Sequence, residues 1–255
     1  MQKWRVYMVK GLYTAYTGMI NEQNRLDILS NNLANADTNG YKKEGATNQT
    51  FADELAIKIK DTSSYGMPQK LGTMSMGVHI GETYTDYSQG NFRVTDNATD
   101  FALDGDGFFA IAYTDKAGNT SVKYSRDGAF VVNTAGYLVT KDARIQVDPN
   151  VPITVDEKGN IFQNNQQVGT IGVVDIADYN YLAKYGENMY VLVNGGARQA
   201  STAKVTQGCI ESSNINVVSE MVNMITISRA FQAGQKVINA VDETLDKAVN
   251  QVGRV

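Results

Sequence analysis

Residues 217–252 read VVSEMVNMITISRAFQAGQKVINAVDETLDKAVNQV and form a long amphipathic pattern. Apolar residues recur there at alternating steps of three and four, and Glu220 is the one charged residue on the path. We call this path the C-terminal seam; its apolar members are Val217, Met224, Ile227, Phe231, Gly234, Ile238, Val241, Leu245, Ala248 and Val252. An apolar position about every 3.5 residues predicts a helix that packs lengthwise against another helix.

A matching pattern lies near the start of the chain. This N-terminal seam consists of Leu12, Ala15, Met19, Glu22, Leu26, Leu29 and Leu33. It predicts a helix that begins near Val9 and stops at Asn35, before Asn39-Gly40, because both residues of that pair accept positive φ. The two ends of the chain therefore carry the two long helices, which can pair with each other.

The sequence between the seams changes character. Residues 83–205 hold short apolar runs separated by Gly, Asn and Asp at intervals of about 8–12 residues, which is typical of a small β-sandwich or barrel. Residues 51–60 have apolar residues at helical spacing and are expected to add a few helical turns, whereas residues 61–81 are expected to be an extended or loop connector.

These patterns predict an α+β fold in which a coiled-coil-like, discontinuous helical domain from both termini carries an inserted all-β domain. The predicted boundaries are 1–50 and 206–255 for the helical parts, 51–82 for a connector and 83–205 for the β-rich domain.

Composition excludes several classes of function. The net charge of −4 leaves no basic footprint for nucleic acid. No apolar run is long enough for membrane insertion, and the first residues lack the apolar core of a cleavable signal peptide. A single cysteine, Cys209, cannot form an intramolecular disulfide.

The search for catalytic residues is nearly empty. His79 is the one histidine and has no cysteine or carboxylate at metal-ligand spacing, and Cys209 is distant in sequence. Residues 104–107, Asp-Gly-Asp-Gly, lack the further oxygen ligands of a calcium loop and are read as a turn that enters a strand. We therefore predict no catalytic residue, no cofactor and no metal. One alternative remains open: Asp100, Asp104, Asp106 and Asp127 could converge in a carbohydrate-binding or hydrolytic β domain with a helical dimerisation handle.

Four asparagines near the end of the first helix are unfavourable for helix formation, namely Asn31, Asn32, Asn35 and Asn39. We expect their amides to bond to neighbouring subunits. With them, the predicted subunit interface consists of Leu12, Met19, Leu26, Leu29, Leu33, Met224, Ile227, Phe231, Gly234, Ile238, Val241 and Leu245.

Three blocks of the sequence carry a family resemblance. Residues 31–42, NNLANADTNGYK, resemble the N-terminal signature of the flagellar rod and hook family. GDGFF at 105–109, YSRDGAF at 124–130 and GYLVT at 136–140 resemble that family's β domain, and QGCIESSNINV at 207–217 with the last helix resembles its C-terminal signature. The resemblance covers nearly the whole chain from about Met8, and it does not separate distal-type from proximal-type rod proteins.

The resemblance implies a structural role in the basal body of the bacterial flagellum. It implies that the terminal helices build the inner tube of a helical assembly around an export channel, with the β domain outside. The implied partners are further copies of the chain, other rod and hook subunits and the flagellar type III export apparatus, which moves subunits without a cleavable signal. It implies torque transmission and no enzymatic activity.

A two-helix scaffold that binds another protein's helix in a groove is a further alternative.

Overall fold

The computed structural model describes residues 2–51, 54–58, 69–74, 77–114, 118, 120–132, 137–139, 145–146, 148, 151–186, 188–193 and 195–252. The chain folds into two compact units, each assembled from separate segments. The helical unit combines residues 1–33, 44–86 and 217–255, and the β unit combines residues 34–43 and 87–216. The chain therefore passes between the units after residues 33, 43, 86 and 216.

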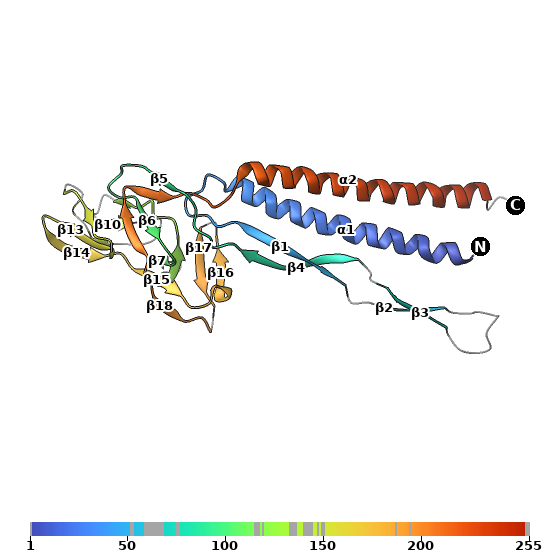
Figure 1. Cartoon of the computed structure of the whole chain (residues 1–255), viewed down its shortest axis with the longest axis horizontal. Helices are drawn as coiled ribbons and strands as arrows, with labels where there is room; N and C mark the ends of the chain where they lie inside the picture. The colour runs from blue at the N-terminus through green and yellow to red at the C-terminus, as the bar shows by residue number, and fades with distance from the viewer. Residues whose placement is uncertain are drawn as a thin grey trace. The chain divides into compact units, whose positions relative to one another are not determined.

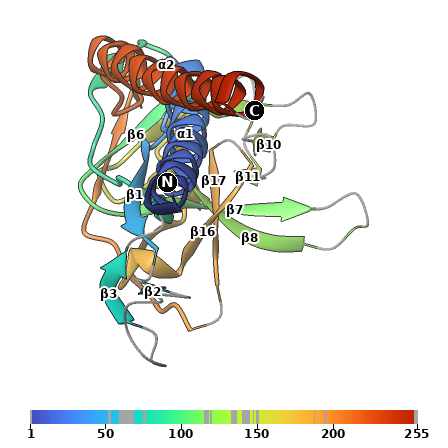
Figure 2. The ribbon, with the colours of Figure 1, turned by 90° about the vertical axis from the view of Figure 1, so that its right-hand side faces the viewer.

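Two long helices dominate the helical unit. Helix α1 spans Gln2–Ala34, and helix α2 spans Val217–Lys247 and continues as the π-helical turn Ala248–Val252. They run in opposite directions, and α1 lies between α2 and strands β1 and β4 in Figure 1 and between α2 and β1 in Figure 2. The first helix begins earlier than expected but ends as predicted, before a turn in which Gly40 has a φ of 66°. A helix at each end with strands between confirms the α+β class.

Strands β1 to β4 complete the described part of the helical unit. Strand β1 (Glu44–Thr50) pairs antiparallel with β4 (Val78–Thr85), and β2 (Glu54–Lys58) pairs antiparallel with β3 (Gln69–Met74).

One prediction for this part of the chain is wrong. The segment expected to add helical turns contains strand β2, whereas the segment expected to be an extended or loop connector contains β3 and the first residues of β4, which are extended. Leu55, Ile57 and Ile59 alternate in the sequence, so the same residues satisfy a strand pattern as well as the helical spacing. Positions 61–68 and 75–76 of the expected connector lie outside the described residues, as do positions 59–60 of the expected helical turns.

The β unit consists of short antiparallel strands, as the sequence predicts. Its largest sheet has the order β16-β17-β8-β7-β15-β18. The strands of that sheet are β7 (Phe108–Thr114), β8 (Thr120–Ser125), β15 (Val173–Ile176), β16 (Leu182–Tyr185), β17 (Met189–Leu192) and β18 (Arg198–Ala200). A 3₁₀ turn, Tyr179–Tyr181, precedes β16.

Smaller sheets surround this one, with the orders β11-β10-β9, β12-β13-β14, β19-β6 and β20-β5. Their strands are β5 (Phe92–Val94), β6 (Phe101–Asp104), β9 (Val131–Val132), β10 (Tyr137–Val139), β11 (Ile145–Gln146), β12 (Thr154–Val155), β13 (Asn160–Gln163), β14 (Gln166–Thr170), β19 (Lys204–Gln207) and β20 (Cys209–Glu211).

Strand β7 is buried on both faces. Successive side chains of a strand point to opposite sides, and Phe109 and Ile111 join one hydrophobic cluster while Phe108 joins another. The larger cluster also contains Phe101, Phe130, Leu138 and Ile161, and the smaller contains Tyr124, Ile176 and Tyr190. Each such side chain contributes about 1.5–3 kcal/mol on burial, so the β unit has its own core.

Residues 104–107 form a tight turn that enters β7, as predicted. Gly105 and Gly107 have φ values of 112° and 143°, which only glycine adopts readily. An added Cβ at Gly107 would lie 2.6 Å from the Ser201 hydroxyl oxygen, so the turn also packs closely on the segment before β19.

Candidate functional site

The C-terminal seam forms the least exposed face of α2. Its members from Met224 to Val241 are buried or half-buried, whereas most α2 residues between them are exposed. Ile227 is 5% exposed, and Leu245 near the end of the helix is 38% exposed. The 3.5-residue spacing read from the sequence therefore marks the face of α2 that is turned away from solvent.

The predicted α1 residues Leu12, Met19, Leu26, Leu29 and Leu33 are all half-buried. Met19 meets α2 at Gly234, where an added Cβ would lie 2.7 Å from Met19 Cγ and 3.4 Å from its Sδ. Gly234 thus admits the Met19 side chain against the α2 backbone. The two seams are in contact at this point within one chain.

A second face of α1 is polar and buried against β1. The Asn32 side chain is fully buried; its Nδ2 donates to the Glu44 carbonyl at 2.8 Å, and its Oδ1 accepts from the Glu44 N–H at 3.0 Å. Asn21 Nδ2 donates to Asn48 Oδ1 at 3.2 Å. The Asn32 amide takes the place of a strand neighbour for the Glu44 backbone in β1, which gives this helical asparagine a structural role.

The four asparagines near the end of α1 differ in what they contact. The Asn32 amide bonds to the backbone of Glu44 inside the chain. Asn39 is also tied within the β unit: its Oδ1 accepts from Arg93 Nη2 at 3.2 Å, and its carbonyl accepts from Asn188 Nδ2 at 2.9 Å. Asn35 Oδ1 accepts from the Thr38 hydroxyl in the turn after α1, and Asn31 is exposed on the helix.

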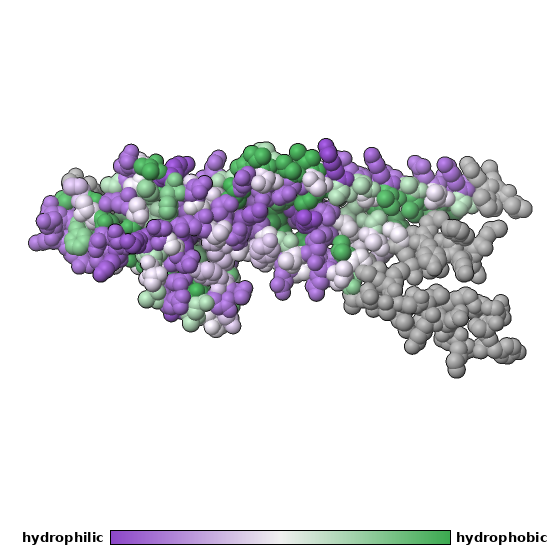
Figure 3. Space-filling view, in the orientation of Figure 1, coloured by the Kyte–Doolittle hydropathy of each residue, from purple (hydrophilic) through white to green (hydrophobic). Residues whose placement is uncertain are grey.

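A feature that the sequence reasoning missed is a second apolar face on each helix, here called the outer stripe. On α2 it consists of Val218, Met221, Val222 and Ile225, which are 72%, 47%, 58% and 53% exposed. On α1 it consists of Tyr13, Tyr16 and Ile20, which are 48%, 53% and 41% exposed. Figure 3 shows hydrophobic residues gathered over the first turns of α2. Steps of three and four also connect these residues, so their pattern was present in the sequence beside the seam.

The β unit contains a buried ionic cluster of Lys42, Arg126 and Glu211, here called the Glu211 cluster. Their side chains are 1%, 3% and 0% exposed. Lys42 Nζ donates to Glu211 Oε1 at 2.5 Å and to the Ser88 carbonyl at 2.8 Å. Arg126 Nη1 donates to Glu211 Oε2 at 3.2 Å. The cluster joins segments that are far apart in sequence.

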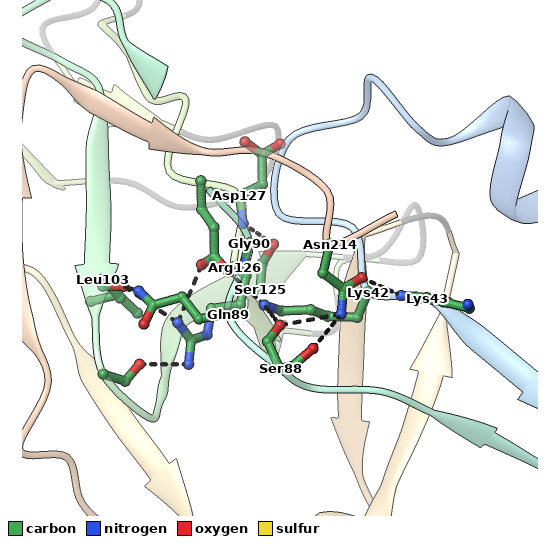
Figure 4. Close-up of polar contacts among 12 residues, drawn as sticks. Lys42, Lys43, Ser88, Gln89, Gly90, Leu103, Ser125, Arg126, Asp127 and Asn214 are labelled. Atoms are coloured by element: carbon green, nitrogen blue, oxygen red, sulfur yellow. Dashed lines mark hydrogen bonds and ion pairs between the residues drawn. The ribbon is translucent and has the colours of Figure 1, made fainter. Parts of the chain in front are cut away.

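Further polar contacts surround the cluster (Figure 4). Gly90 N–H donates to Glu211 Oε1 at 2.9 Å, and Arg126 Nη2 donates to the Gly105 carbonyl at 2.8 Å. Asn214 Oδ1 accepts from Lys43 N–H at 2.8 Å, and Asn214 Nδ2 donates to the Ser88 hydroxyl at 3.0 Å and to its carbonyl at 3.2 Å. Three of the motif blocks read as separate signatures therefore meet in one place.

The described residues offer little that resembles a catalytic centre. Within the described ranges, no group of three or more His, Cys, Asp and Glu side chains could hold a metal ion. His79 lies against Phe51, with ring centroids 4.6 Å apart, and Cys209 is half-buried in β20. Asp100 accepts hydrogen bonds from Thr95 and Asn97, while Asp104 and Asp106 are exposed. No helix among the described residues is both long and apolar enough to span a membrane.

Comparison with known proteins identifies the family. A model described as "Flagella basal body rod protein" matches residues 12–42, the "Flagellar hook protein FlgE/F/G D1 domain" matches 102–176, and the "Flagellar basal body rod FlgEFG protein C-terminal" matches 206–252. The flagellar basal-body rod protein FlgF of Caulobacter vibrioides is 33% identical, over 97% of this chain and 100% of its own length.

Two proteins of Bacillus subtilis strain 168 give the same result. The flagellar hook-basal body complex protein FlhO is 32% identical over 97% of this chain and 100% of its own length. The flagellar basal-body rod protein FlgG is 32% identical over 95% of this chain and 99% of its own length. Similarity along almost the entire sequence means that this chain belongs to the family of flagellar basal-body rod and hook proteins, which are structural proteins rather than enzymes.

Proposed function

We propose that the chain is a structural subunit of the bacterial flagellar basal-body rod and is needed for flagellum-dependent motility. It self-assembles through its terminal helices into a helical tube that surrounds the export channel and transmits torque. Its partners are further copies of itself and the other rod and hook subunits. The flagellar type III export apparatus delivers it to the basal body without a cleavable signal peptide.

The observation that carries the self-assembly proposal is the outer stripe. Four apolar side chains of α2 are between 47% and 72% exposed although the seam of the same helix is already turned inward. Burying each large aliphatic side chain contributes about 1.5–3 kcal/mol, so covering this face with a neighbouring subunit favours association by several kcal/mol. A head-to-tail repeat of that contact that does not close gives a helical filament.

The two seams have a complementary role in this proposal. They pair α1 with α2 within one chain in a coiled-coil-like arrangement, in which Met19 packs against Gly234. The predicted interface residues of both helices then support assembly by holding the outer stripes at fixed spacing. Leu245, half exposed at the far end of α2, extends the contact to a neighbour.

The test is a matched pair of substitutions on one turn of α2. Ile225→Asp places a carboxylate in the outer stripe, and Asn223→Asp places the same carboxylate on an exposed position outside it. We expect Ile225→Asp to abolish polymers detected by sedimentation and electron microscopy, and Asn223→Asp to preserve them. Both variants should keep the helical content of the wild type in circular dichroism. Polymers of unchanged amount from Ile225→Asp would contradict the proposal.

A second substitution separates the seam from the stripe. Ile238→Asp places a charge on the half-buried face of α2. We expect it to lower helical content and to prevent assembly together, because it disturbs α2 itself. Normal rods from this variant would show that the seam has no part in assembly.

A further inference from the structure

The Glu211 cluster lies where the chain leaves the β unit. The chain passes to or from the helical unit after residues 43, 86 and 216. Lys42 and Lys43 precede the first of these crossings, Ser88 follows the second, and Asn214 precedes the third. All four residues bond to one another or to Glu211 inside the β unit.

Glu211 is the shared acceptor of this arrangement. Its side chain accepts from Lys42 and Gly90 through Oε1 and from Arg126 through Oε2, and its carbonyl accepts from the Gly40 N–H at 2.8 Å. One residue therefore contacts the segment after α1 and the segment after β4, and itself lies in the segment before α2. Arg126 also ties the group to the turn that enters β7 by its bond to the Gly105 carbonyl.

Close backbone approaches hold the same segments together independently of charge. An added Cβ at Gly90 would lie 2.0 Å from the Ser212 carbonyl oxygen, and one at Gly40 would lie 2.4 Å from the Arg126 carbonyl carbon. Gly40 also has a φ of 66°. Glycine is required at both places because a side chain would overlap the neighbouring backbone. The segments at Gly90 and Ser212, and those at Gly40 and Arg126, are therefore in direct backbone contact.

Net stability is a weak reason for such a cluster. A buried ion pair contributes little beyond what packed apolar residues would contribute, because the loss of hydration offsets the attraction. Buried charges can instead select one conformation of the segments that carry them, because any other arrangement leaves a buried charge without its partner.

We propose, on the basis of the proposed function, that Glu211 is a positioning residue for assembly. Its carboxylate gathers the three segments that connect the β unit to the rest of the chain, and so fixes the points at which β1 and α2 begin and β4 ends. The terminal helices then present their outer stripes to a neighbour from one defined set of chain exits. Without the carboxylate, Lys42 and Arg126 are two buried cations in one site, and the exits separate.

The test uses Glu211→Gln in the full chain, which keeps the shape and removes the charge. The matched control is Glu157→Gln, because Glu157 forms an ion pair with Lys204 in which both side chains are more than 60% exposed (68% and 62%). We expect hydrogen exchange of the Gly40, Lys43 and Gly90 amides to rise about tenfold in Glu211→Gln, as for a local opening, while amides of β7 and β8 stay unchanged. The control should leave all of them unchanged.

Assembly is measured on the same variants. We expect the protein concentration at which polymers form to rise about tenfold for Glu211→Gln, which corresponds to a loss of one decade in the association constant, and to stay unchanged for Glu157→Gln. If Glu211→Gln does not fold, Lys42→Met carries the test, with the same local pattern of exchange at lower amplitude, because Arg126 still pairs with the carboxylate.

The outcomes separate the two proposals. An equal rise of exchange at every amide would show that Glu211 acts only on global stability and would overturn its positioning role. Local exchange with an unchanged polymerisation concentration would overturn it as well. A wild-type chain that never polymerises, alone or with other rod subunits, would refute the proposed function, and the exchange pattern would still decide whether Glu211 holds the three segments.

Discussion

Replacing Asn32 by alanine should destabilise the helical unit by about 1.5–3.5 kcal/mol. The substitution leaves the Glu44 N–H and carbonyl without the two bonds that Asn32 supplies at 3.0 and 2.8 Å in a fully buried position. Each of these part-buried groups costs about 1–2 kcal/mol when it loses its partner, the lower part of the range for fully buried groups, and the better helix propensity of alanine returns about 0.5 kcal/mol. The substitution Asn24→Ala on the same helix removes an amide from an exposed position and should stay within about 0.5 kcal/mol of the wild type.

The assay is urea unfolding followed by circular dichroism, with hydrogen exchange of the Glu44 amide as the local readout. In Asn32→Ala the midpoint should fall and the Glu44 amide should exchange faster than in the wild type. Asn32→Asp should be at least as destabilising, because a carboxylate keeps the acceptor for the N–H but places negative charge against the Glu44 carbonyl. Equal stability of Asn24→Ala and Asn32→Ala would refute the assignment of Asn32 to β1.

Two other predictions concern the β unit. Gly40→Ala should cost more than the roughly 1–2 kcal/mol of a left-handed alanine, because its Cβ would overlap the Arg126 backbone at 2.4 Å, whereas Gly118→Ala (φ 84°, with nothing within 4 Å) should cost only that strain; thermal unfolding of both variants checks the difference, and equal losses would contradict it. Burial, followed by the hydrogen bond that the hydroxyl donates to Asp175 at 3.0 Å, raises the pKa of Tyr179 to about 12. Since this folded-state pKa exceeds the ordinary value of 10.0, its contribution to stability is complete below pH 10 and is lost as the pH rises through about 12. An ultraviolet titration should show a late-ionising tyrosine that disappears in Tyr179→Phe, and identical curves for the two proteins would count against this environment.

Periodicity predicted the helices well because it depends on local spacing alone. The seam of α2 and the end of α1 could both be read from residues a few positions apart. The same rule failed at Leu55 and Ile57, which fit two periods at once, and the pairing of β2 with β3 decides between them. The residues of the outer stripe also recur at helical spacing in the sequence, but the longer apolar pattern of the seam was interpreted as the contact face of each helix.

The Glu211 cluster could not be predicted in this way. Lys42, Arg126 and Glu211 belong to three separate blocks, and no local pattern states that they meet. Asn32 illustrates the same limit on a shorter scale. An asparagine in a helix is unfavourable by propensity, and only the position of β1 explains where its amide bonds.

The four passages of the chain between its units have a consequence for how the molecule is made. Synthesis and any threading through a narrow conduit proceed from the first residue to the last. The helical unit needs segments from both ends, so it stays incomplete until residues 217–255 have been synthesised. Until then the N-terminal seam has no α2 to pack against. The β unit needs residues 34–43 from the front of the chain but can close once residue 216 emerges. A fragment intended to fold alone must therefore start at residue 34, since a cut placed after residue 50 would discard Lys42 and with it one side of a buried charge pair.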